Sequence, residues 1–333
     1  MKHMHHNTRK PMILLAVCAA LTFGIFGCTN SNTAMGNDNT VASTDTPTNV
    51  PADAPTAVPT EAPADTAPPS NFNNDKDIMV ISREEGSGTR GAFIELFGIE
   101  IKAEDGTKVD HTTKEAVITN NTGVMMTNVT GDPYAIGYMS LGSVNETVKA
   151  LGIEGIAATA DNVKNGSYVV SRPFNIAVKG TLSEVAQDFV DYIMSKEGQA
   201  VVADSYIAID DNAPAYAGSS PAGKIVVAGS SSVTPVMQKL REAYLLINAN
   251  AQIEIQESDS TAGMIAAIDG NCDIGMASRE LKDDEKEQLI DTQIALDGIA
   301  VVVNTTNPIS NMTKEQVKSI FMGETVKWSE MAQ

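Results

Sequence analysis

Apolar residues are unevenly distributed along the 333-residue chain, and their spacing divides it into three parts. One continuous apolar run covers residues 12–26, and residues 29–76 contain almost no large apolar side chain. After residue 76, short apolar runs alternate with segments of helical periodicity, which is typical of an α/β fold. The third part, about 255 residues, would form one large or two small domains. The runs predicted as strands cover residues 78–81, 136–139, 224–228, 252–256 and 299–303.

Residues 1–28 have the pattern of a secretory signal peptide. Lys2, Arg9 and Lys10 precede the apolar run, which is short for a membrane span. The run ends in Ile-Phe-Gly-Cys28, which resembles the lipobox of bacterial lipoproteins, where the cysteine carries a lipid. We therefore expect a protein anchored through Cys28 on the extracytoplasmic face of the cell membrane. The alternative is an ordinary signal peptide in which Cys28 is incidental.

Residues 29–76 are dominated by Thr, Ala, Pro, Asp and Asn. This composition buries too little apolar surface to fold, so it predicts a disordered tether. A lipid anchor followed by a tether keeps a soluble domain near the membrane and lets it reach a partner. Cys18 lies in the signal peptide and Cys28 at the lipobox, which leaves only Cys272. We therefore expect no disulfide framework.

The charge excludes one class of function. The net charge of −19 becomes −22 without the signal peptide, which contains three basic residues and no acidic one. Nucleic-acid binding needs clustered cations, so no nucleic-acid partner is expected. A small anion is still compatible with this charge. Local dipoles and one or two arginines decide a buried site, while surface carboxylates are screened within about 8–10 Å.

Four turns rich in hydroxyl groups each join a predicted strand to a predicted helix. In open α/β sheets such turns share one edge, where ligands bind. Free N–H groups at a helix start, hydroxyls and a guanidinium together can hold a tetrahedral oxyanion. One serine at a helix start is usually a cap, but four such turns in one chain favour an anion site. The turns cover residues 83–89, 229–234, 257–263 and 273–279.

Capping signals predict where several helices begin. A hydroxyl residue before a proline, or three residues before Glu or Gln, marks a helix start. These signals predict an N-cap at Thr234, and capping boxes at Thr181 with Glu184 and at Thr313 with Gln316. Ser278, between a short strand and a charged helix, is a further predicted N-cap.

Five segments at and around these turns resemble the phosphate-binding proteins of bacterial phosphate ABC transporters. The REEGSGT segment at residues 83–89 matches the family motif of Arg, any residue, Asp or Glu, then Gly-Ser-Gly-Thr. The resemblance covers nearly the whole region after the tether. The segments are ISREEGSGTRGAF, AGSSSVTPVM, ESDSTAGMIAAIDGNCDIGMASRELK, LDGIAVVVN and IFMGETVKW.

The order of these segments differs from that of the family. The family normally begins with the segment seen here at Lys224 and reaches the SGT motif after the tryptophan segment. This chain runs from the SGT motif to residue 217, crosses GSSPAG at 218–223 and finishes with the usual first half at Trp328. This resembles a circular permutation, which is tolerated where the original termini lie close together at the surface. A piece of a longer tandem and an exchange of halves between two chains are the alternatives.

The resemblance implies the two-lobed periplasmic-binding-protein fold of type II, with the ligand in the cleft between lobes. In the family, the segments that resemble residues 299–303 and 169–175 cross between the lobes. When these crossing points are carried over to this chain, one lobe comprises residues 77–171 with 305–333, and the other comprises residues 172–304. The C-terminal tail is therefore expected to pair with the N-terminal part of the folded region.

The resemblance also implies which residues contact the ligand. Arg83 matches the ligand-binding arginine, and the SGT residues match the hydroxyls and the amide that hold phosphate oxygens. Ser278 and Arg279 fall where the family has either an aspartate or a Ser-Arg pair. The residues implied to bind phosphate are Arg83, Glu85, Ser87, Gly88, Thr89, Ser231, Ser232, Ser260, Ser278 and Arg279.

Both arginines also have a purely structural interpretation. Arg83 could form a surface ion pair with Glu84, and Arg279 could pair along its helix with Asp283. The polar turn at residues 120–122 could touch the ligand or be an ordinary loop.

Glu85 lies where the family usually has aspartate. Its carboxylate would accept the proton of hydrogen phosphate and would repel sulfate, which carries no proton at neutral pH. The alternative is an acid that stabilises the first helical turn through the macrodipole.

The resemblance implies a non-enzymatic lipoprotein that captures inorganic phosphate and delivers it to a membrane ABC permease. We expect a monomer without cofactor or metal. One alternative is a binder of another tetrahedral oxyanion, or a phosphate sensor without transport. A serine hydrolase or phosphatase is a further alternative, but it requires a base, and His111 is the single histidine after the signal peptide.

Overall fold

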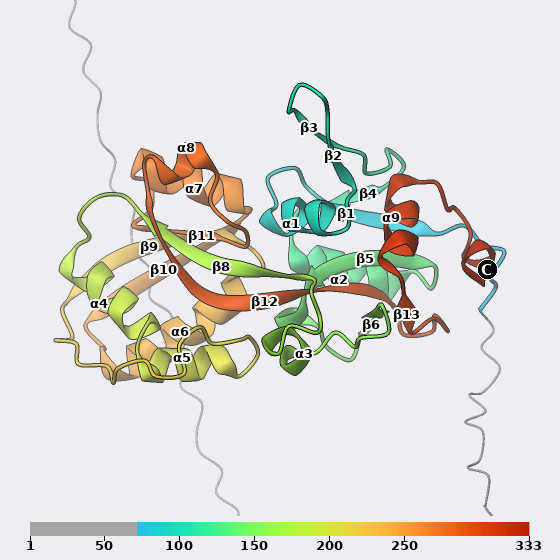
Figure 1. The fold of residues 1–333 in the computed structure, drawn as a ribbon. Coiled ribbons are helices and arrows are strands. Elements are labelled where there is room, and N and C mark those ends of the chain that lie inside the picture. Colours follow the sequence, from blue (N-terminus) through green and yellow to red (C-terminus); the bar gives the residue numbers. More distant parts are fainter. Residues whose placement is uncertain (1–71, 333) are drawn as a thin grey trace, which may run out of the picture. The chain divides into compact units, whose positions relative to one another are not determined.

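The structure, a computed structural model, describes residues 72–332. The predicted signal peptide, Cys28 and residues 29–71 of the predicted tether lie outside the described residues. The tether was predicted too long, because Phe72 packs against Tyr134 and Trp328, and the Asn74 carbonyl accepts from the Ser329 N–H over 2.7 Å. Strands and helices alternate along the chain (Figure 1), as the α/β prediction requires. All five predicted strands are confirmed. They are β1 (Met79–Arg83), β5 (Ala135–Ser140), β9 (Gly223–Ser230), β10 (Ala251–Ser258) and β12 (Ile290–Asn304).

Nine strands form one sheet in the order β10-β9-β11-β8-β12-β5-β1-β4, with β6 paired to β12. Strands β8 and β12 are antiparallel and connect the two ends of this order. The first part of β12, up to Gly298, pairs with β8, and Ile299–Val303 pairs with β5. The further strands of this sheet are β4 (Val117–Thr119), β6 (Val148–Ala150), β8 (Ser171–Val178) and β11 (Ile274–Ala277).

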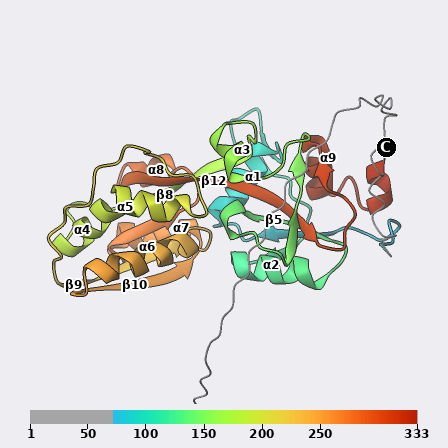
Figure 2. The ribbon, with the colours of Figure 1, turned by 90° about the horizontal axis from the view of Figure 1, so that it is seen from below.

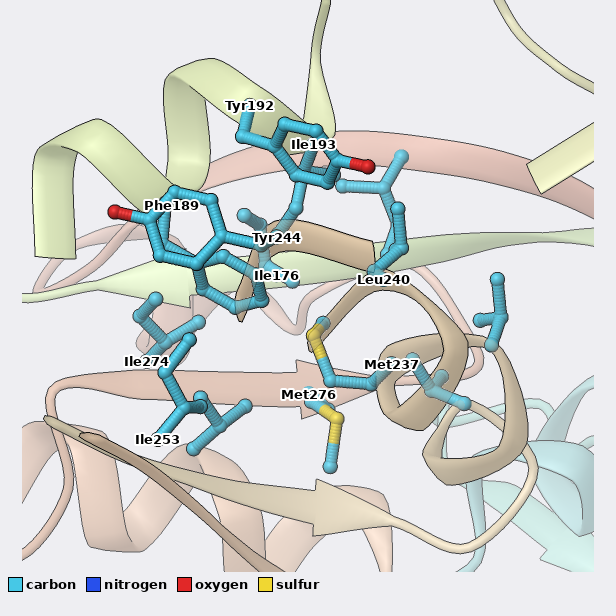
Figure 3. Close-up of a cluster of buried hydrophobic side chains, with 14 of the residues drawn as sticks. Ile176, Phe189, Tyr192, Ile193, Met237, Leu240, Tyr244, Ile253, Ile274 and Met276 are labelled. Atoms are coloured by element: carbon cyan, nitrogen blue, oxygen red, sulfur yellow. The ribbon is translucent and has the colours of Figure 1, made fainter. Parts of the chain in front are cut away.

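One end of the sheet is built around buried residues between Phe174 and Ala295, and we call it the continuous half. Successive strand residues point to opposite faces, so Val227 packs with α4, α5 and α6 while Ala228 packs with α7. Figure 3 shows Phe189 of α4 and Tyr244 of α6 in the first of these clusters. The helices are α4 (Glu184–Ile193), α5 (Lys196–Ala203), α6 (Thr234–Ile247), α7 (Ser260–Asp269) and the short α8 (Asp283–Lys286).

The other end, which we call the two-ended half, takes its core from residues 80–170 and 299–328, with Ile207. Phe93 stacks on Tyr138 in its centre, with ring centroids 3.9 Å apart, and Phe321 packs edge-on against Phe93. Helix α2 covers one face of β5, and α1 and α9 lie on the opposite side (Figure 2). The helices are α1 (Gly88–Leu96), α2 (Thr122–Gly131), α3 (Ala160–Lys164) and α9 (Lys314–Met322).

Both ends of the described chain meet in the two-ended half. Asp77 and Lys327 form an antiparallel bridge, and the Ile78 N–H donates to the Val326 carbonyl over 2.8 Å. The buried Trp328 indole donates to the Tyr134 carbonyl over 3.2 Å. The smaller elements of this half are β2 (Glu100–Lys102), β3 (Lys108–Asp110), β7 (Gly152–Ile153), β13 (Asn311–Met312) and the 3-10 turns Leu141–Ser143 and Trp328–Ala332.

The capping predictions had mixed outcomes. The capping box of Thr313 with Gln316 is confirmed at the start of α9. The other three predictions are wrong, because each helix begins after a residue other than the predicted one. Ser183 caps α4 in place of Thr181, Val233 precedes α6 while Thr234 donates to the Ser230 carbonyl, and α8 begins after Lys282, beyond Ser278.

Within residues 72–332, no helix combines the length and the apolar character that a bilayer crossing demands.

Candidate anion-binding site

Three helices begin with a capping side chain at the junction of the two halves. Ser87 caps α1 by accepting from the Arg90 N–H over 3.3 Å, and Asn121 caps α2 by accepting from Val124 over 2.8 Å. In the continuous half, Asp259 caps α7 by accepting from Ala262 over 2.8 Å. Each of these caps leaves further N–H groups of the first turn free of helical partners, which gives the helix start a partial positive charge.

Six buried hydroxyl residues meet beside these helix starts, and we call them the hydroxyl cluster. None of them is more than 6% exposed. The Thr89 hydroxyl lies 2.8 Å from the Ser232 hydroxyl and 3.3 Å from the Ser278 hydroxyl. The Thr122 hydroxyl lies 3.2 Å from the Ser231 hydroxyl. The members of the cluster are Thr89, Thr122, Ser231, Ser232, Ser260 and Ser278.

The cluster spans both halves of the molecule. Thr89 and Thr122 come from the two-ended half, and the four serines come from the continuous half. The hydroxyls of Ser260 and Ser278 lie 3.4 Å apart, and the Ser278 N–H donates to the Ser260 hydroxyl over 3.1 Å. The loops thus bring together groups that lie up to 189 residues apart in sequence.

Two glycines allow the halves to approach this closely. A Cβ on Gly86 would lie 2.4 Å from an Asp259 carboxylate oxygen, and one on Gly88 would lie 2.5 Å from the Ser260 hydroxyl. Backbone contact across the same junction is direct, because the Thr261 N–H donates to the Gly86 carbonyl over 3.2 Å. Any side chain at residue 88 would displace hydroxyls of the cluster.

Arg83 reaches across the junction from the end of β1. It is 2% exposed, and it donates to both Glu84 carboxylate oxygens over 2.8 and 2.6 Å. The Nη2 atom of Arg83, which donates to one Glu84 oxygen, also donates to the Ser231 hydroxyl over 3.1 Å. The backbone N–H of Arg83 donates to the Tyr138 hydroxyl over 3.0 Å, and burial raises the pKa of Tyr138 to about 12. A neutral phenol therefore helps to fix the backbone of Arg83.

Arg279 makes its contacts within the continuous half. It donates to both oxygens of Glu285 over 2.7 and 2.8 Å, and to the Thr261 hydroxyl over 3.3 Å. Burial raises the pKa of Glu285, but hydrogen bonds from Arg279 and Lys282 outweigh it and leave the pKa below its usual value. The carboxylate is thus held ionised beside Arg279.

Arg172, which the sequence analysis did not single out, also reaches the cluster. It lies on β8 and donates through Nη1 to Asp297 over 2.7 Å and through Nη2 to the Thr89 hydroxyl over 2.9 Å. Two guanidinium groups, those of Arg83 and Arg172, thus reach the hydroxyls, and each is already paired with a carboxylate. Such an arrangement can hold an oxyanion by directed hydrogen bonds and dipoles, with little net local charge.

The structure brings most of the predicted site residues together but not all. Five of the predicted hydroxyl residues are in the cluster, while Ser87 caps α1. Glu85 is exposed, and Glu84 is the carboxylate that pairs with Arg83. Arg279 pairs with Glu285, where the structural interpretation had Asp283. Thr122, from the polar turn at residues 120–122, lies inside the cluster.

A cavity of about 460 Å³ lies at the other end of β1, near Met79, Tyr134 and Val326. Its lining is mainly apolar, and it lies away from the hydroxyl cluster. It lacks the converging donors that a small anion requires, so it does not compete with the cluster as an anion site.

Two halves connected by two crossing strands, with converging polar groups between them, define a two-lobed solute-binding protein. The model of the PBP superfamily domain matches residues 64–197 and 214–333. A Streptococcus agalactiae phosphate-binding protein PstS 2 is 55% identical over 266 residues, covering 79% of this chain and 90% of its own. A crystal structure of a phosphate-binding protein of a phosphate ABC transporter from Streptococcus pneumoniae has a TM-score of 0.62 and 45% identity. It covers 77% of this chain and 99% of that one.

A third relative, the phosphate-binding protein PstS of Staphylococcus haemolyticus, is 36% identical over 111 residues. That match covers 31% of this chain and 35% of the relative. The chain belongs to the PBP superfamily and, within it, to the family of the phosphate-binding proteins PstS. The predicted fold class is thereby confirmed.

Proposed function

We propose that the chain is an extracytoplasmic receptor that captures inorganic phosphate between its two halves and delivers it to an ABC transporter. Its relatives are binding proteins, so the chain is not an enzyme. The hydrolase alternative gains no support from the site. Ser231 is hydrogen-bonded to Arg83 and Thr122, neither of which is a general base.

The observation that carries the proposal is the hydroxyl cluster with Arg83 across the junction. Its donors come from both halves, most of the hydroxyls lie at helix starts, and all of the donors are buried. A phosphate ion needs many donors around four oxygens, and it gains most where those donors are fixed before it arrives. Donors from two halves can enclose one ion only when the halves close around it.

The donors have the directions that an anion needs. Arg83 Nη2 and the Thr122 N–H both point to the Ser231 hydroxyl oxygen, at 3.1 and 3.3 Å. A hydroxyl that accepts two N–H groups has its own proton free for another acceptor. Ser231 would therefore donate to a phosphate oxygen, and the Arg83 guanidinium would supply the countercharge.

Two predicted residues are left out of the assignment, because Glu85 is exposed and Arg279 is bound by Glu285. We assign the phosphate contacts to the other eight predicted residues, which lie in or beside the hydroxyl cluster. These are Arg83, Ser87, Gly88, Thr89, Ser231, Ser232, Ser260 and Ser278.

Strands β8 and β12 would act as the hinge. The proposed lobes are residues 77–171 with 305–333, and residues 172–304. The boundary at the start of β8 is supported by the two cores, whereas Ile299–Val303 of β12 pack in the core of the two-ended half and pair with β5. Phosphate would favour the closed form because only that form offers donors from both lobes.

The rotated order of segments is part of the proposal. It is supported by the contact of both chain ends through Asp77 and Lys327, and by the exposed connection at residues 218–223. The long match to the streptococcal relative and the short match to the staphylococcal one also support a rotated order of segments. A linear alignment between chains of different order can follow only one half.

Membrane attachment through a lipid on Cys28, followed by a tether that ends before Phe72, completes the proposal, with a monomeric receptor. Mass spectrometry of the membrane fraction tests it directly. A diacylglycerol on Cys28 is expected, and an unmodified secreted chain would contradict it.

Isothermal titration of the full chain with phosphate, sulfate and arsenate tests the function. We expect micromolar or tighter phosphate binding and much weaker sulfate binding. A folded chain that binds sulfate more tightly than phosphate would support the other-oxyanion alternative. A folded chain that binds none of the three would contradict the receptor proposal.

A further inference from the structure

Arg172 connects three elements through one buried side chain. It lies on β8 and donates through Nη1 to the Asp297 carboxylate of β12 over 2.7 Å and to the Gly298 carbonyl over 3.2 Å. Through Nη2 it donates to the Thr89 hydroxyl at the start of α1 over 2.9 Å. The residue is 3% exposed, and its guanidinium carbon lies 5.1 Å from the centre of the Phe174 ring. Both crossing strands are thus connected to the hydroxyl cluster.

A guanidinium determines which way a neighbouring hydroxyl points. A threonine hydroxyl has one proton and two lone pairs, whereas a guanidinium only donates. Because Arg172 Nη2 occupies one lone pair of Thr89, the Thr89 proton has to point to another acceptor. The oxygens within reach are those of Ser232, at 2.8 Å, and Ser278, at 3.3 Å, both on the cluster side.

We propose that Arg172 is a positioning residue that fixes the Thr89 hydroxyl as a hydrogen-bond donor to the bound phosphate. The inference rests on the proposed phosphate-binding function and adds a residue to it. Arg172 acts through Thr89, with both of its terminal nitrogens already occupied. Asp297 in turn orients Arg172, and its other oxygen accepts from the Gly142 N–H over 3.2 Å.

The same arrangement recurs at two other hydroxyls of the cluster. The Ser231 hydroxyl accepts from Arg83 Nη2 and the Thr122 N–H, and the Ser260 hydroxyl accepts from the Ser278 N–H. Each hydroxyl receives an N–H group from the protein and keeps its proton for a further acceptor. Arg172 differs from the other donors because it projects from a crossing strand and not from a strand-to-helix turn.

Stability alone gives little reason for this ion pair. Desolvating two charges often outweighs their attraction, and apolar residues of similar volume are frequently as stable. Burial lowers the pKa of Arg172, against the attraction of Asp297. A buried pair at a crossing point, with one nitrogen directed at the cluster, is instead suited to fixing geometry.

A double-mutant cycle on the full chain tests the inference by phosphate titration. The variants are Arg172→Lys, Thr89→Val and their combination, with Arg241→Lys on α6 as the matched control. Lysine keeps the charge near Asp297 but lacks the second nitrogen that reaches Thr89. We expect Arg172→Lys to weaken phosphate binding about tenfold or more in the wild-type background, and less than about threefold when residue 89 is valine.

The outcomes are distinguishable. If the wild-type chain binds phosphate and Arg172→Lys binds equally well, the inference is overturned and the proposed function stands. The inference is also overturned if the fold-losses of phosphate affinity in the two single variants multiply in the double variant. Arg172 would then not act through Thr89. A wild-type chain that binds no phosphate overturns both. Urea unfolding of each variant checks the fold, and Asp297→Asn replaces Arg172→Lys in the cycle if the lysine variant does not fold.

Discussion

Two turns that follow strands of the sheet make different use of an arginine. In the turn at Arg83 the guanidinium binds a glutamate and also a hydroxyl of the opposite half. In the turn at Arg279 the guanidinium binds a glutamate and a hydroxyl of its own half. Both side chains are largely buried and both ion pairs are bidentate. The geometry of the two ion pairs therefore does not explain why the two arginines have different roles.

The difference lies in what each arginine connects. Arg83 contacts the hydroxyl cluster across the junction, so its energy of interaction depends on the closure of the two halves. Arg279 stabilises the segment that leads from β11 into α8, independently of closure. Removal of Arg83 should affect phosphate binding more than folding. Removal of Arg279 should affect folding more than phosphate binding.

Arg83→Gln is expected to have the largest effect on binding. Loss of a charge-assisted hydrogen bond to a buried anion, with Glu84 left uncompensated, should weaken phosphate binding about a hundredfold or more. Isothermal titration measures the change, with Arg279→Gln as the matched control. Equal losses in the two variants would remove the contrast between the turns.

Gly88→Ala should have the next largest effect. The added Cβ would lie 2.5 Å from the Ser260 hydroxyl and 2.9 Å from the Ser278 hydroxyl, so the halves have to separate by a fraction of an ångström. We expect about tenfold weaker phosphate binding, because misplaced donors lose most of their contribution. Gly91→Ala is the control on the same helix, since a Cβ there meets nothing within 4 Å. Unchanged affinity in Gly88→Ala would argue against close contact of the halves.

Arg279→Gln should change phosphate affinity by less than about threefold and should mainly reduce stability. It leaves the buried Glu285 carboxylate without its cation, which typically destabilises a fold by about 3 kcal/mol. Urea unfolding measures the loss of stability, and titration of the same sample with phosphate measures the affinity. A stable variant with greatly weakened binding would assign Arg279 to the ligand instead.

The strand and turn positions could be predicted from sequence because they depend on local patterns. Apolar runs identified the five strands, and hydroxyl-rich turns after strands identified the edge where Ser231, Ser260 and Ser278 meet. The parts that could not be predicted depend on contacts between distant residues. Arg172 and Thr89 are 83 positions apart, and a lone arginine before a proline carries no sign of such a contact.

The partner of Arg279 was predicted wrongly for a related reason. The pairing with Asp283 assumed that Arg279 lies in a helix that starts at Ser278. The helix α8 begins at Asp283, so the four-residue spacing of a helix does not apply, and Glu285 comes into reach. The structural partner expected for Arg83, Glu84, is the one that the structure shows, but Arg83 is buried in the junction and not at the surface.

The smallest effect concerns the pH dependence of stability. The pKa of Glu285 in the folded protein lies below its usual value of 4.5, so its pairing stabilises the fold above that pH. The stabilisation is lost as the pH falls through the folded pKa. The difference in unfolding midpoint between wild type and Glu285→Gln should therefore be largest near pH 7 and should shrink below about pH 4.5. A difference in unfolding midpoint that stays constant across this pH range would show that the Glu285 charge does not contribute to stability.

The central claim is that hydroxyls from helix starts in both halves, with Arg83, hold a single phosphate ion. A crystal structure of the full chain grown with phosphate tests this most directly. We predict one phosphate whose oxygens lie within about 3 Å of Arg83, Thr89 and Ser231 at the same time. A phosphate bound by residues of one half alone, or at a different surface with the hydroxyl cluster unchanged, would contradict the account.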